Sequence, residues 1–404
     1  KFYVERINIF GNNITQENVI RNSLEIDEGD PFNELLNAKS INNIKSLRIF
    51  KNVKSELVEG SEPNTKIINI EVEEKPTGEI SIGAGVGSEG GTVGFSVSEN
   101  NFLGRGIKLG TSLRVTDDSI KGAFTILNPN FNYSNKSLST TVESTNIDKL
   151  SENGYETTKT GFSFGTGFEQ YENTYFRPTL STYFEDLTTN KKASANLKKQ
   201  SGSYFDTKLN YNLDFDNRNQ RFQTSEGNRF VFAQGIPLIS EEYSLRNTLE
   251  YQTWKKFNNE VVTSVSLYGS MVNSLKDEDV RITDRISLPR KRLKGFQYGA
   301  IGPVDSGDYV GGNYASVINF SATLPMILST VENVDVKYFL DVGNLWGVDY
   351  SSSIDDSNKI RSSTGIGVDW FTPIGPMTLS IAQDLSKANT DKTESFQFNL
   401  GTTF

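Results

Sequence analysis

The sequence predicts a transmembrane antiparallel β-barrel of about sixteen strands, preceded by one small α/β domain. From residue 79 onward apolar and polar residues alternate, and clusters of Gly, Asn, Asp and Ser separate the alternating segments. Hydrophobic residues make up only 35% of the 404 residues, which is low for a large soluble core. A barrel needs fewer, because the inner face of each strand contacts water. No segment approaches the 18 or so consecutive apolar residues of a membrane helix, so a membrane span here would consist of strands.

The N-terminal α/β domain is expected to cover residues 1–76. A short strand through Ile7 and Ile9 is followed by Thr15, which is placed to cap a first helix. The remaining elements are a second helix from about Asn33 and two strands, at 53–59 and 65–74. The predicted order is therefore β-α-α-β-β.

The barrel is expected to cover residues 77–404, after a stiff connection at Pro76. In one segment Phe205, Thr207, Leu209, Tyr211, Leu213 and Phe215 alternate with Asp206, Lys208, Asn210, Asn212 and Asp214. A soluble antiparallel sheet shows the same alternation, so the pattern of one segment does not decide between the two. The presence of about sixteen such segments, with aromatic residues near their ends, favours the membrane barrel.

One connection, at residues 271–312, is far longer than an ordinary loop. It contains Leu293-Lys294-Gly295-Phe296 and Ile301-Gly302-Pro303, which combine aromatic, apolar and glycine residues. A disordered segment has a more polar composition. We therefore expect this segment to be a long luminal loop, packed in the interior of the barrel.

Composition excludes several classes of function. The net charge is −9 and no basic block appears, which argues against a nucleic-acid partner. The chain has no cysteine and no histidine, so it lacks thiolate nucleophiles, imidazole bases and the usual zinc ligands. A formal G-x-G-x-x-G pattern starts at Gly85, but no helix follows it, as a nucleotide site would require. We therefore expect no enzyme activity, no cofactor and no metal.

Short motifs follow one another along the chain in a fixed order. They are Gly11-Asn12, Asn128-Pro129-Asn130-Phe131, Asp214 to Gly227, Leu293-Lys294-Gly295-Phe296, Gly302-Pro303, Gly311-Gly312-Asn313, Phe339 to Gly343 with Trp346, Trp370 to Pro376, and Phe396 to Phe404. In this order they resemble the BamA family of outer-membrane assembly proteins, whose POTRA modules precede a sixteen-strand barrel. The resemblance covers nearly the whole chain, and it implies that residues 1–76 are the POTRA domain nearest the barrel.

The resemblance also implies a function, a location and partners. The function is that of a central component of outer-membrane protein assembly, in the Gram-negative outer membrane with the POTRA domain in the periplasm. The implied partners are unfolded outer-membrane proteins, accessory assembly lipoproteins bound through the POTRA domain, periplasmic chaperones and the lipid bilayer. Two positions depart from the family. Lys294 stands where relatives carry Arg, and Ser321, near the expected start of the next strand, stands where they often carry Glu.

A luminal loop anchor is the first candidate site. Lys294 is expected to pair with Asp341, which strand parity places on the luminal side together with Phe339. Gly295 allows a tight turn, and Phe296 supplies an apolar anchor. A single ammonium needs only one carboxylate, unlike the planar fork of Arg. The alternative interpretation is a solvated lysine in an exposed loop.

A lateral seam between the first and last strands is the second candidate site. The first strand carries Ile80, Ile82, Gly83, Gly85 and Gly87, and the last strand carries Phe398, Leu400 and Gly401. Glycine weakens a strand through backbone entropy and missing cross-strand contacts, so we expect a seam that can open. An open seam would offer backbone donors and acceptors to an incoming strand, which is β-augmentation. The alternative is a curved strand that makes room for the luminal loop.

The end of the chain is the third candidate site. Phe396, Phe398, Leu400 and Phe404 alternate with polar residues, and the terminal aromatic resembles the signal by which outer-membrane proteins are themselves recognised. A last lipid-facing strand would show the same pattern, and the two interpretations are compatible.

Three other functions remain as alternatives. A two-partner secretion transporter would pass an unfolded chain through the lumen instead of the seam. A passive porin would need neither a luminal loop nor an N-terminal domain. An outer-membrane hydrolase would need a base other than histidine, such as Lys or a carboxylate.

Overall fold

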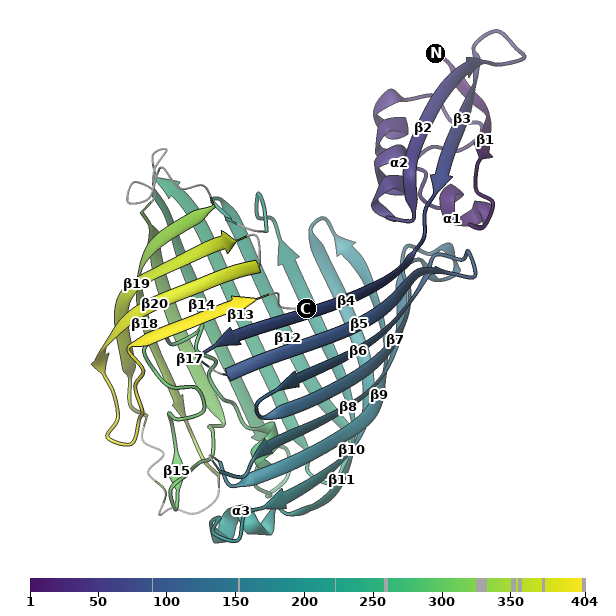
Figure 1. Cartoon of the computed structure of the whole chain (residues 1–404). Coiled ribbons are helices and arrows are strands. Elements are labelled where there is room, and N and C mark those ends of the chain that lie inside the picture. The colour runs from purple at the N-terminus through teal and green to yellow at the C-terminus, as the bar shows by residue number, and fades with distance from the viewer. Residues whose placement is uncertain are drawn as a thin grey trace. The chain divides into compact units, whose positions relative to one another are not determined.

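The structure is a computed structural model of the whole chain (Figure 1). It describes residues 1–88, 90–151, 153–221, 223–257, 261–324, 333–349, 354, 358–372 and 375–401. The strands of these residues form a three-stranded sheet, a closed barrel and a two-stranded sheet. Within the described residues, no helix is both long and apolar enough to cross a membrane.

The N-terminal domain combines two helices with a three-stranded sheet. In chain order its elements are β1 (Tyr3–Phe10), α1 (Glu17–Arg21), α2 (Glu34–Ser46), β2 (Phe50–Glu59) and β3 (Thr65–Glu74). The sheet order is β1-β3-β2, with β1 parallel and β2 antiparallel to β3. The second helix begins next to Asn33 as predicted, and Asn33 caps it, because its side chain accepts hydrogen bonds from the N–H groups of Leu35 and Leu36. The β-α-α-β-β order is thus confirmed.

Two details of this domain differ from the prediction. Thr15 does not cap the first helix, which begins at Glu17 after Gln16 and has no side-chain capping bond. The backbone N–H of Thr15 instead donates to the carboxylate of Glu74 at 2.6 Å, so β3 holds the segment before the helix. The second strand begins at Phe50, three residues earlier than predicted, because Phe50 pairs with Glu74 and is buried.

The barrel consists of sixteen antiparallel strands in the described residues, as predicted. They are β4 (Gly78–Gly87), β5 (Gly90–Phe102), β6 (Ile107–Thr116), β7 (Ser119–Asn128), β8 (Ser137–Lys149), β9 (Tyr155–Tyr171), β10 (Thr174–Thr189), β11 (Gly202–Asp216), β12 (Gly227–Ser240), β13 (Ser244–Phe257), β14 (Val261–Ser274), β17 (Tyr314–Thr323), β18 (Val334–Trp346), β19 (Arg361–Thr372), β20 (Gly375–Ser386) and β21 (Phe396–Gly401). Each strand neighbours the next along the chain, and β21 pairs with β4 to close the barrel. Figure 1 shows the dark-blue β4 beside the yellow last strand.

The alternation of the strands separates an outer from an inner face. On β11, Phe205 is 45% exposed, whereas its neighbour Asp206 is only 1% exposed. The outer surface is apolar, and the inner surface carries the charged groups that the luminal loop contacts. The period of two in the sequence therefore assigned most side chains of this strand to the correct face.

The long connection runs from residue 275 to residue 313, because β14 continues to Ser274 and β17 starts at Tyr314. The predicted range of 271–312 therefore began inside a strand and ended one residue early. The connection contains the short helix η2 (Ile282–Asp284) and a small hairpin of β15 (Val304–Asp305) and β16 (Asp308–Tyr309). Two further short elements lie in other connections, η1 (Phe131–Tyr133) and α3 (Ala195–Lys199).

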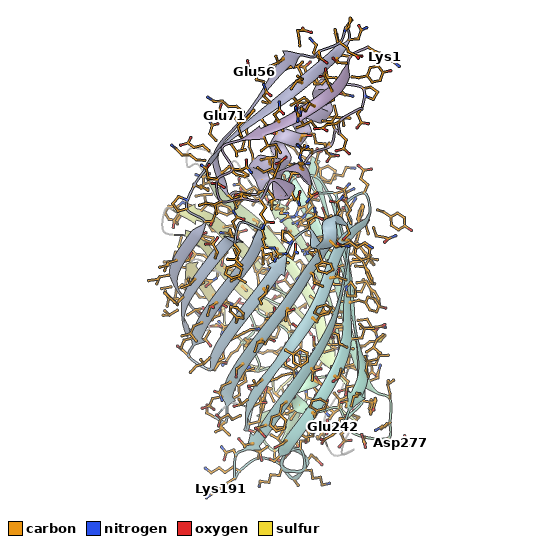
Figure 2. The ribbon with its side chains drawn as sticks, turned by 90° about the vertical axis from the view of Figure 1, so that its right-hand side faces the viewer. Lys1, Glu56, Glu71, Lys191, Glu242 and Asp277 are labelled. Atoms are coloured by element: carbon orange, nitrogen blue, oxygen red, sulfur yellow. The ribbon has the colours of Figure 1, made fainter. Side chains whose placement is uncertain are left out.

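The long connection packs inside the barrel. Its residues Leu293, Phe296 and Ile301 form one buried cluster with inward-facing residues of the wall, among them Val272 and Leu345. Figure 1 shows α3 and β15 at the same end of the barrel, and Figure 2 shows Lys191, Glu242 and Asp277 at that end. The loop therefore enters the lumen from the end that carries α3.

Candidate functional site: the luminal loop and the barrel seam

The tip of the loop is anchored to the wall by an ion pair. Nζ of Lys294 lies 2.9 Å from Oδ2 of Asp341, and the backbone N–H of Lys294 donates to the same oxygen at 3.0 Å. The other oxygen, Oδ1, accepts from Asn319 at 2.8 Å. Asp341 is completely buried and Lys294 is 20% exposed. A buried carboxylate needs such partners for each oxygen, and here both are satisfied.

The residues next to Lys294 fix the path of the tip. Gly295 has φ +84°, and a Cβ there would lie 2.9 Å from Cβ of Ala382, so a side chain would be strained as well as crowded. Phe296 is buried, and the ring of Phe339 lies 4.3 Å from Nζ of Lys294, within the range of a cation–π contact. The structure thus brings together all five residues of the candidate loop anchor.

Ser321, by contrast, takes no part in this anchor. It lies near the end of β17 and not near its start, and its hydroxyl is 2.7 Å from that of Ser264 on β14. Asn319, two residues earlier on the same face, binds Asp341 and also donates to the carbonyl oxygen of Arg292 in the loop. The expectation that Ser321 lies near the start of this strand is therefore wrong.

The loop tip also contacts the segment that leads into the last strand. Phe296 and Thr393 form an isolated antiparallel bridge, and the N–H of Glu394 donates to the carbonyl oxygen of Gly295 at 2.9 Å. Nε2 of Gln397, on β21, donates to the carbonyl oxygen of Phe296 at 2.9 Å. The anchor and the seam are therefore connected through only a few residues.

A second buried ion pair supports the same segment. Asp391 receives two hydrogen bonds from the guanidinium of Arg361, at 2.8 and 3.0 Å, and both side chains are buried. Arg361 also donates to Oδ1 of Asn344 at 2.6 Å. This bidentate geometry is the strong form of an Arg–carboxylate contact, so it holds the connection before β21 against β18 and β19.

The base of the loop is held by Arg281, which has no exposed surface. Its guanidinium lies 2.9 Å from Glu185 on β10 and 2.8 Å from Asp206 on β11, and it covers the ring of Tyr204 at 4.1 Å. Such a buried cation requires paired carboxylates. Arg281 thus binds the start of the loop to β10 and β11, whereas the tip of the loop is anchored to β18.

Sequence reasoning missed these supporting residues, which are Arg281, Glu185, Arg361, Asp391, Asn319 and Gln397. The alternating pattern did place Asp206 on the polar inner face. No pattern of period two, however, says which inward residue a loop distant in sequence will contact.

Glu242 has an altered acidity in this environment. It lies in the turn between β12 and β13, with Oε2 3.3 Å from Nε of Arg281. Burial raises the pKa of Glu242 to about 7, and Arg281 opposes this while Asp284, Asp206 and Glu278 add to it. The carboxyl group therefore titrates near neutral pH, unlike an ordinary glutamate.

The seam between β21 and β4 is short. In the described residues, Asn399 is opposite Gly87, Leu400 is opposite Val86 and Gly401 is opposite Gly85. The hydroxyl of Ser88 accepts from the N–H of Phe398 at 3.0 Å and extends the contact slightly. By comparison, β10 and β11 are paired along almost their entire length. Within residues 85–88 and 398–401, few backbone hydrogen bonds therefore join β4 to β21.

The glycines of the seam let the two backbones approach closely. A Cβ at Gly87 would lie 2.8 Å from the carbonyl oxygen of Phe398. One at Gly401, where φ is +140°, would lie 2.4 Å from Cα of Gly85. A larger residue at these positions would separate the strands, so the glycines shape the seam in addition to weakening it.

The other residues of the candidate seam lie before this contact. Ile80 and Ile82 are exposed on the outer face of β4, and Gly83 is buried on its inner face. None of the three has a partner in the described part of β21.

The last strand alternates as expected where it is described. Phe396 is exposed, Phe398 and Leu400 are partly exposed, and Gln397 is buried toward the luminal loop. Phe404 lies outside the described residues. As for metal sites, the described residues contain no cluster of three His, Cys, Asp or Glu side chains with suitable placement.

Comparisons with known proteins agree with this fold. Over its whole length the chain is 24% identical to the outer membrane protein assembly factor BamA of Neorickettsia risticii and 24% identical to that of Neisseria meningitidis, and it spans 55% and 57% of those proteins. A sorting and assembly machinery component 50 homolog from Bos taurus is 27% identical over 39% of this chain and 35% of its own length. The chain thus spans about half the length of the curated bacterial relatives it matches.

Solved structures show the same architecture. The structure of BamA from Haemophilus ducreyi lacking POTRA domains 1–3 superposes with a TM-score of 0.90, at 22% identity, over 100% of this chain and 85% of that one. CdiB from Acinetobacter baumannii superposes with a TM-score of 0.59, at 11% identity, over 99% of this chain and 74% of that one. At such identities the likeness establishes the fold.

Family models assign both parts of the chain. The surface antigen variable number repeat model, of the POTRA family, matches residues 2–75. The Omp85 superfamily domain model matches residues 101–404, which is well over half of the chain. The chain therefore belongs to the Omp85 superfamily.

Proposed function

We propose that this protein assembles β-barrel proteins into the outer membrane by strand addition at the seam between β4 and β21. The observation that carries the proposal is the short pairing of these two strands in the described residues, at the place where the barrel closes. An exposed strand edge is a template for another strand, because its N–H and C=O groups lack partners. Relatives named assembly factors support the same function.

The bilayer supplies the driving force in this mechanism. Backbone groups without partners are costly in hydrocarbon, so a client strand that pairs with the edge of β4 is strongly favoured. Ile80 and Ile82 already lie on the lipid-exposed face, where a client strand would continue the outer surface. The seam thus serves for β-augmentation and requires no ATP or cofactor.

The luminal loop has a supporting role in this proposal. Its tip binds the segment before β21 through Gly295 and Phe296, and Lys294 anchors that tip to Asp341. The loop thereby holds the last strand in register while the edge of β4 is used. The loop packed against the inner wall also argues against passage of an unfolded chain through the barrel interior.

Location and partners follow from the same proposal. The protein would reside in the Gram-negative outer membrane, with the POTRA domain in the periplasm. Unfolded outer-membrane proteins would be the clients, delivered by periplasmic chaperones, and accessory lipoproteins would bind the POTRA domain. The C-terminal pattern of Phe396, Phe398, Leu400 and Phe404 would direct this protein itself into the membrane.

A photo-crosslinking residue at Ile82 tests the proposal directly. Ile82 is 74% exposed and lies on β4 just before the paired part of the seam. In membranes given an unfolded porin, we expect crosslinks from this position to the last strand of the porin. The matched control is Phe164, which is also exposed on the outer face but lies on β9, on a fully paired part of the wall.

The opposite result would point to the alternative function. Crosslinks to a secreted chain from inward positions such as Thr248, without crosslinks from Ile82, would contradict strand addition. They would instead indicate a two-partner secretion transporter that passes its cargo through the lumen.

A further inference from the structure

A cavity of about 450 Å³ lies on the inner wall of the barrel, apart from the loop tip and the seam. It is lined by inward-facing residues of β9 to β14, and Asp284 of the luminal loop borders it. Register explains why space remains there. Arg177, Asn212, Ala233 and Thr248 lie side by side across β10 to β13. The small side chain of Ala233 therefore leaves a hollow between longer ones.

The adjacent row of the wall repeats this arrangement. Thr179, Asn210, Gly235 and Arg246 are neighbours across the same four strands, and Gly235 contributes no side chain at all. The short inward residues of β12 thus form the bottom of the hollow, and longer polar residues of β10 and β11 flank it on one side and those of β13 on the other. The hollow is a consequence of the sequence of β12.

The charge of the cavity is opposite to that of the whole protein. The chain has a net charge of −9, yet the lining contains four cations, which are Lys159, Arg177, Lys208 and Arg246. Asp284 is the one carboxylate among the lining residues that the structure describes. A concave site with low-dielectric walls concentrates such a field, so it attracts anions from the lumen.

The cations are only partly neutralised by the protein. Nζ of Lys208 lies 3.0 Å from both oxygens of Asp284. Arg177 is 3.5 Å from an oxygen of Asp214, a carboxylate that also accepts two hydrogen bonds from Arg229.

Two of the lining cations lack a carboxylate within ion-pair distance. Nζ of Lys159 lies over the ring of Tyr183 at 4.8 Å, and no ion pair of Lys159 occurs in the described residues. Arg246 is half-buried, and within the same part of the chain its guanidinium has neither an ion pair nor a hydrogen bond. A half-buried guanidinium whose five N–H donors have no acceptor in the protein is suited to bind an oxyanion.

We propose that this luminal cavity binds a small phosphate compound with two anionic groups, of the diphosphate type. Arg177 and Arg246 stand on strands three apart, about 14 Å at the backbone, and both line the cavity, so a ligand between the two strands lies within reach of both. Each guanidinium binds one phosphate in bidentate fashion, and Lys159 adds a third positive charge. Hydroxyl and amide groups of Thr179, Thr248 and Asn210 complete the donor set.

Calorimetric titration with inorganic pyrophosphate tests the site on the full chain in lipid nanodiscs, without divalent cations or any client protein. We expect saturable binding to the wild type. Arg246→Gln should weaken it about tenfold or more, because one charge-assisted contact is lost. Ala233→Leu should abolish it by filling the hollow. Lys192→Gln, which removes an exposed charge outside the cavity, should leave it unchanged.

Each variant is first shown to be folded by its circular dichroism and by the shift of the unheated barrel in gel electrophoresis. Absence of binding to the wild type, or equal binding to folded Arg246→Gln, would overturn the site. Binding of an acidic unfolded polypeptide in place of pyrophosphate, with the same dependence on Arg246, would also overturn it and would indicate a polypeptide ligand. The site does not depend on the assembly function, since the titration involves no client.

Discussion

Single residues hold the luminal loop in place through buried charges. The carboxylate of Asp341 binds Nζ and the backbone N–H of Lys294 and the amide of Asn319, so its oxygens are fully used. Lys294 is adequate here without the planar fork of an arginine, because one oxygen accepts its ammonium and Asn319 satisfies the other. Removing one partner of such a pair leaves an uncompensated charge, and that penalty is larger than the net contribution of the pair.

Asp341→Asn should therefore destabilise the barrel strongly. Because a fifth of Lys294 contacts solvent, we expect a loss of about 3 kcal/mol in the free energy of unfolding, near the lower limit for a buried pair. Denaturant titration in lipid vesicles measures it. The control is Asp369→Asn, which breaks a partly exposed luminal pair with Lys337 and should cost about 1 kcal/mol or less. Equal losses in the two variants would contradict the anchor.

Glu242 should make stability depend on pH near neutrality. Its pKa in the folded protein is raised to about 7, so between its usual value of 4.5 and 7 the folded state binds more protons than the unfolded state. The stabilisation that comes from the raised pKa of Glu242 is therefore complete below about pH 4.5, and it is lost as the pH rises through 7. We expect the Tm of the wild type to fall more between about pH 5 and pH 8 than that of Glu242→Gln. Parallel profiles would refute this.

At the scale of elements, the loop tip and the last strand form one connected unit. The tip binds the segment before β21 by a backbone bridge at Phe296 and by the side chain of Gln397, and Arg361 fixes the same segment through Asp391. β21 itself is held to β4 over a short distance. The inner contacts of the loop thus add to the described pairing at the edge of the strand.

Gly295→Ala should disturb this unit more than a glycine substitution elsewhere in the loop. The new Cβ would be strained at φ +84° and would lie 2.9 Å from Cβ of Ala382. Gly307→Ala provides a matched control, because φ there is +99° but nothing lies within 4 Å of the new Cβ. We expect a loss of about 1 kcal/mol for the control and a larger loss for Gly295→Ala, measured by thermal unfolding. A similar Tm for both would argue against tight packing of the tip.

A disulfide across the seam should stop assembly. The chain has no cysteine, and Val86 is directly opposite Leu400, so Val86→Cys with Leu400→Cys places one pair at suitable spacing. Under oxidising conditions we expect porin assembly to fall to background, and a reductant should restore it. The pair Leu180→Cys with Leu209→Cys crosslinks β10 to β11 and should have no effect. Full activity with a locked seam would exclude strand addition.

For the whole molecule, the barrel is closed by the pairing of its first strand with its last. Sixteen strands close it, and a closed ring leaves no edge in the bilayer. Among the described residues, the pairing of β4 with β21 is much shorter than that of β10 with β11. Under the proposed function, a client strand would be added at this seam and not elsewhere in the ring.

Amide hydrogen exchange should be faster at the seam than in the rest of the barrel wall. In lipid nanodiscs we expect fast exchange in β4 and β21 and slow exchange in β10 and β11, because the former share few hydrogen bonds and the latter are paired along their length. Mass spectrometry of peptides from these strands provides the measurement. Equal protection of the four strands would show that the seam is closed more firmly than its pairing suggests.

The sequence by itself determined the class of fold and the faces of its strands. Alternation with a period of two follows from strand geometry, so Phe205 and Asp206 were assigned to opposite faces before any contact was known. The order of the N-terminal elements and the expectation of about sixteen barrel strands rested on equally local signals. The pairing of Lys294 with Asp341 was predicted because parity placed Asp341 inside and the motif order placed Lys294 in the loop.

Only the tertiary structure decided which distant groups meet. The contacts of Arg281 with Glu185, of Arg361 with Asp391 and of Gln397 with Phe296 join residues that share no sequence pattern. The cap expected at Thr15 failed for the same reason, since Glu74 at the end of β3 holds that segment. Inside a barrel every inward residue faces a common lumen, so partners are chosen by the path of the loop and the stagger of the strands, which local periodicity does not encode.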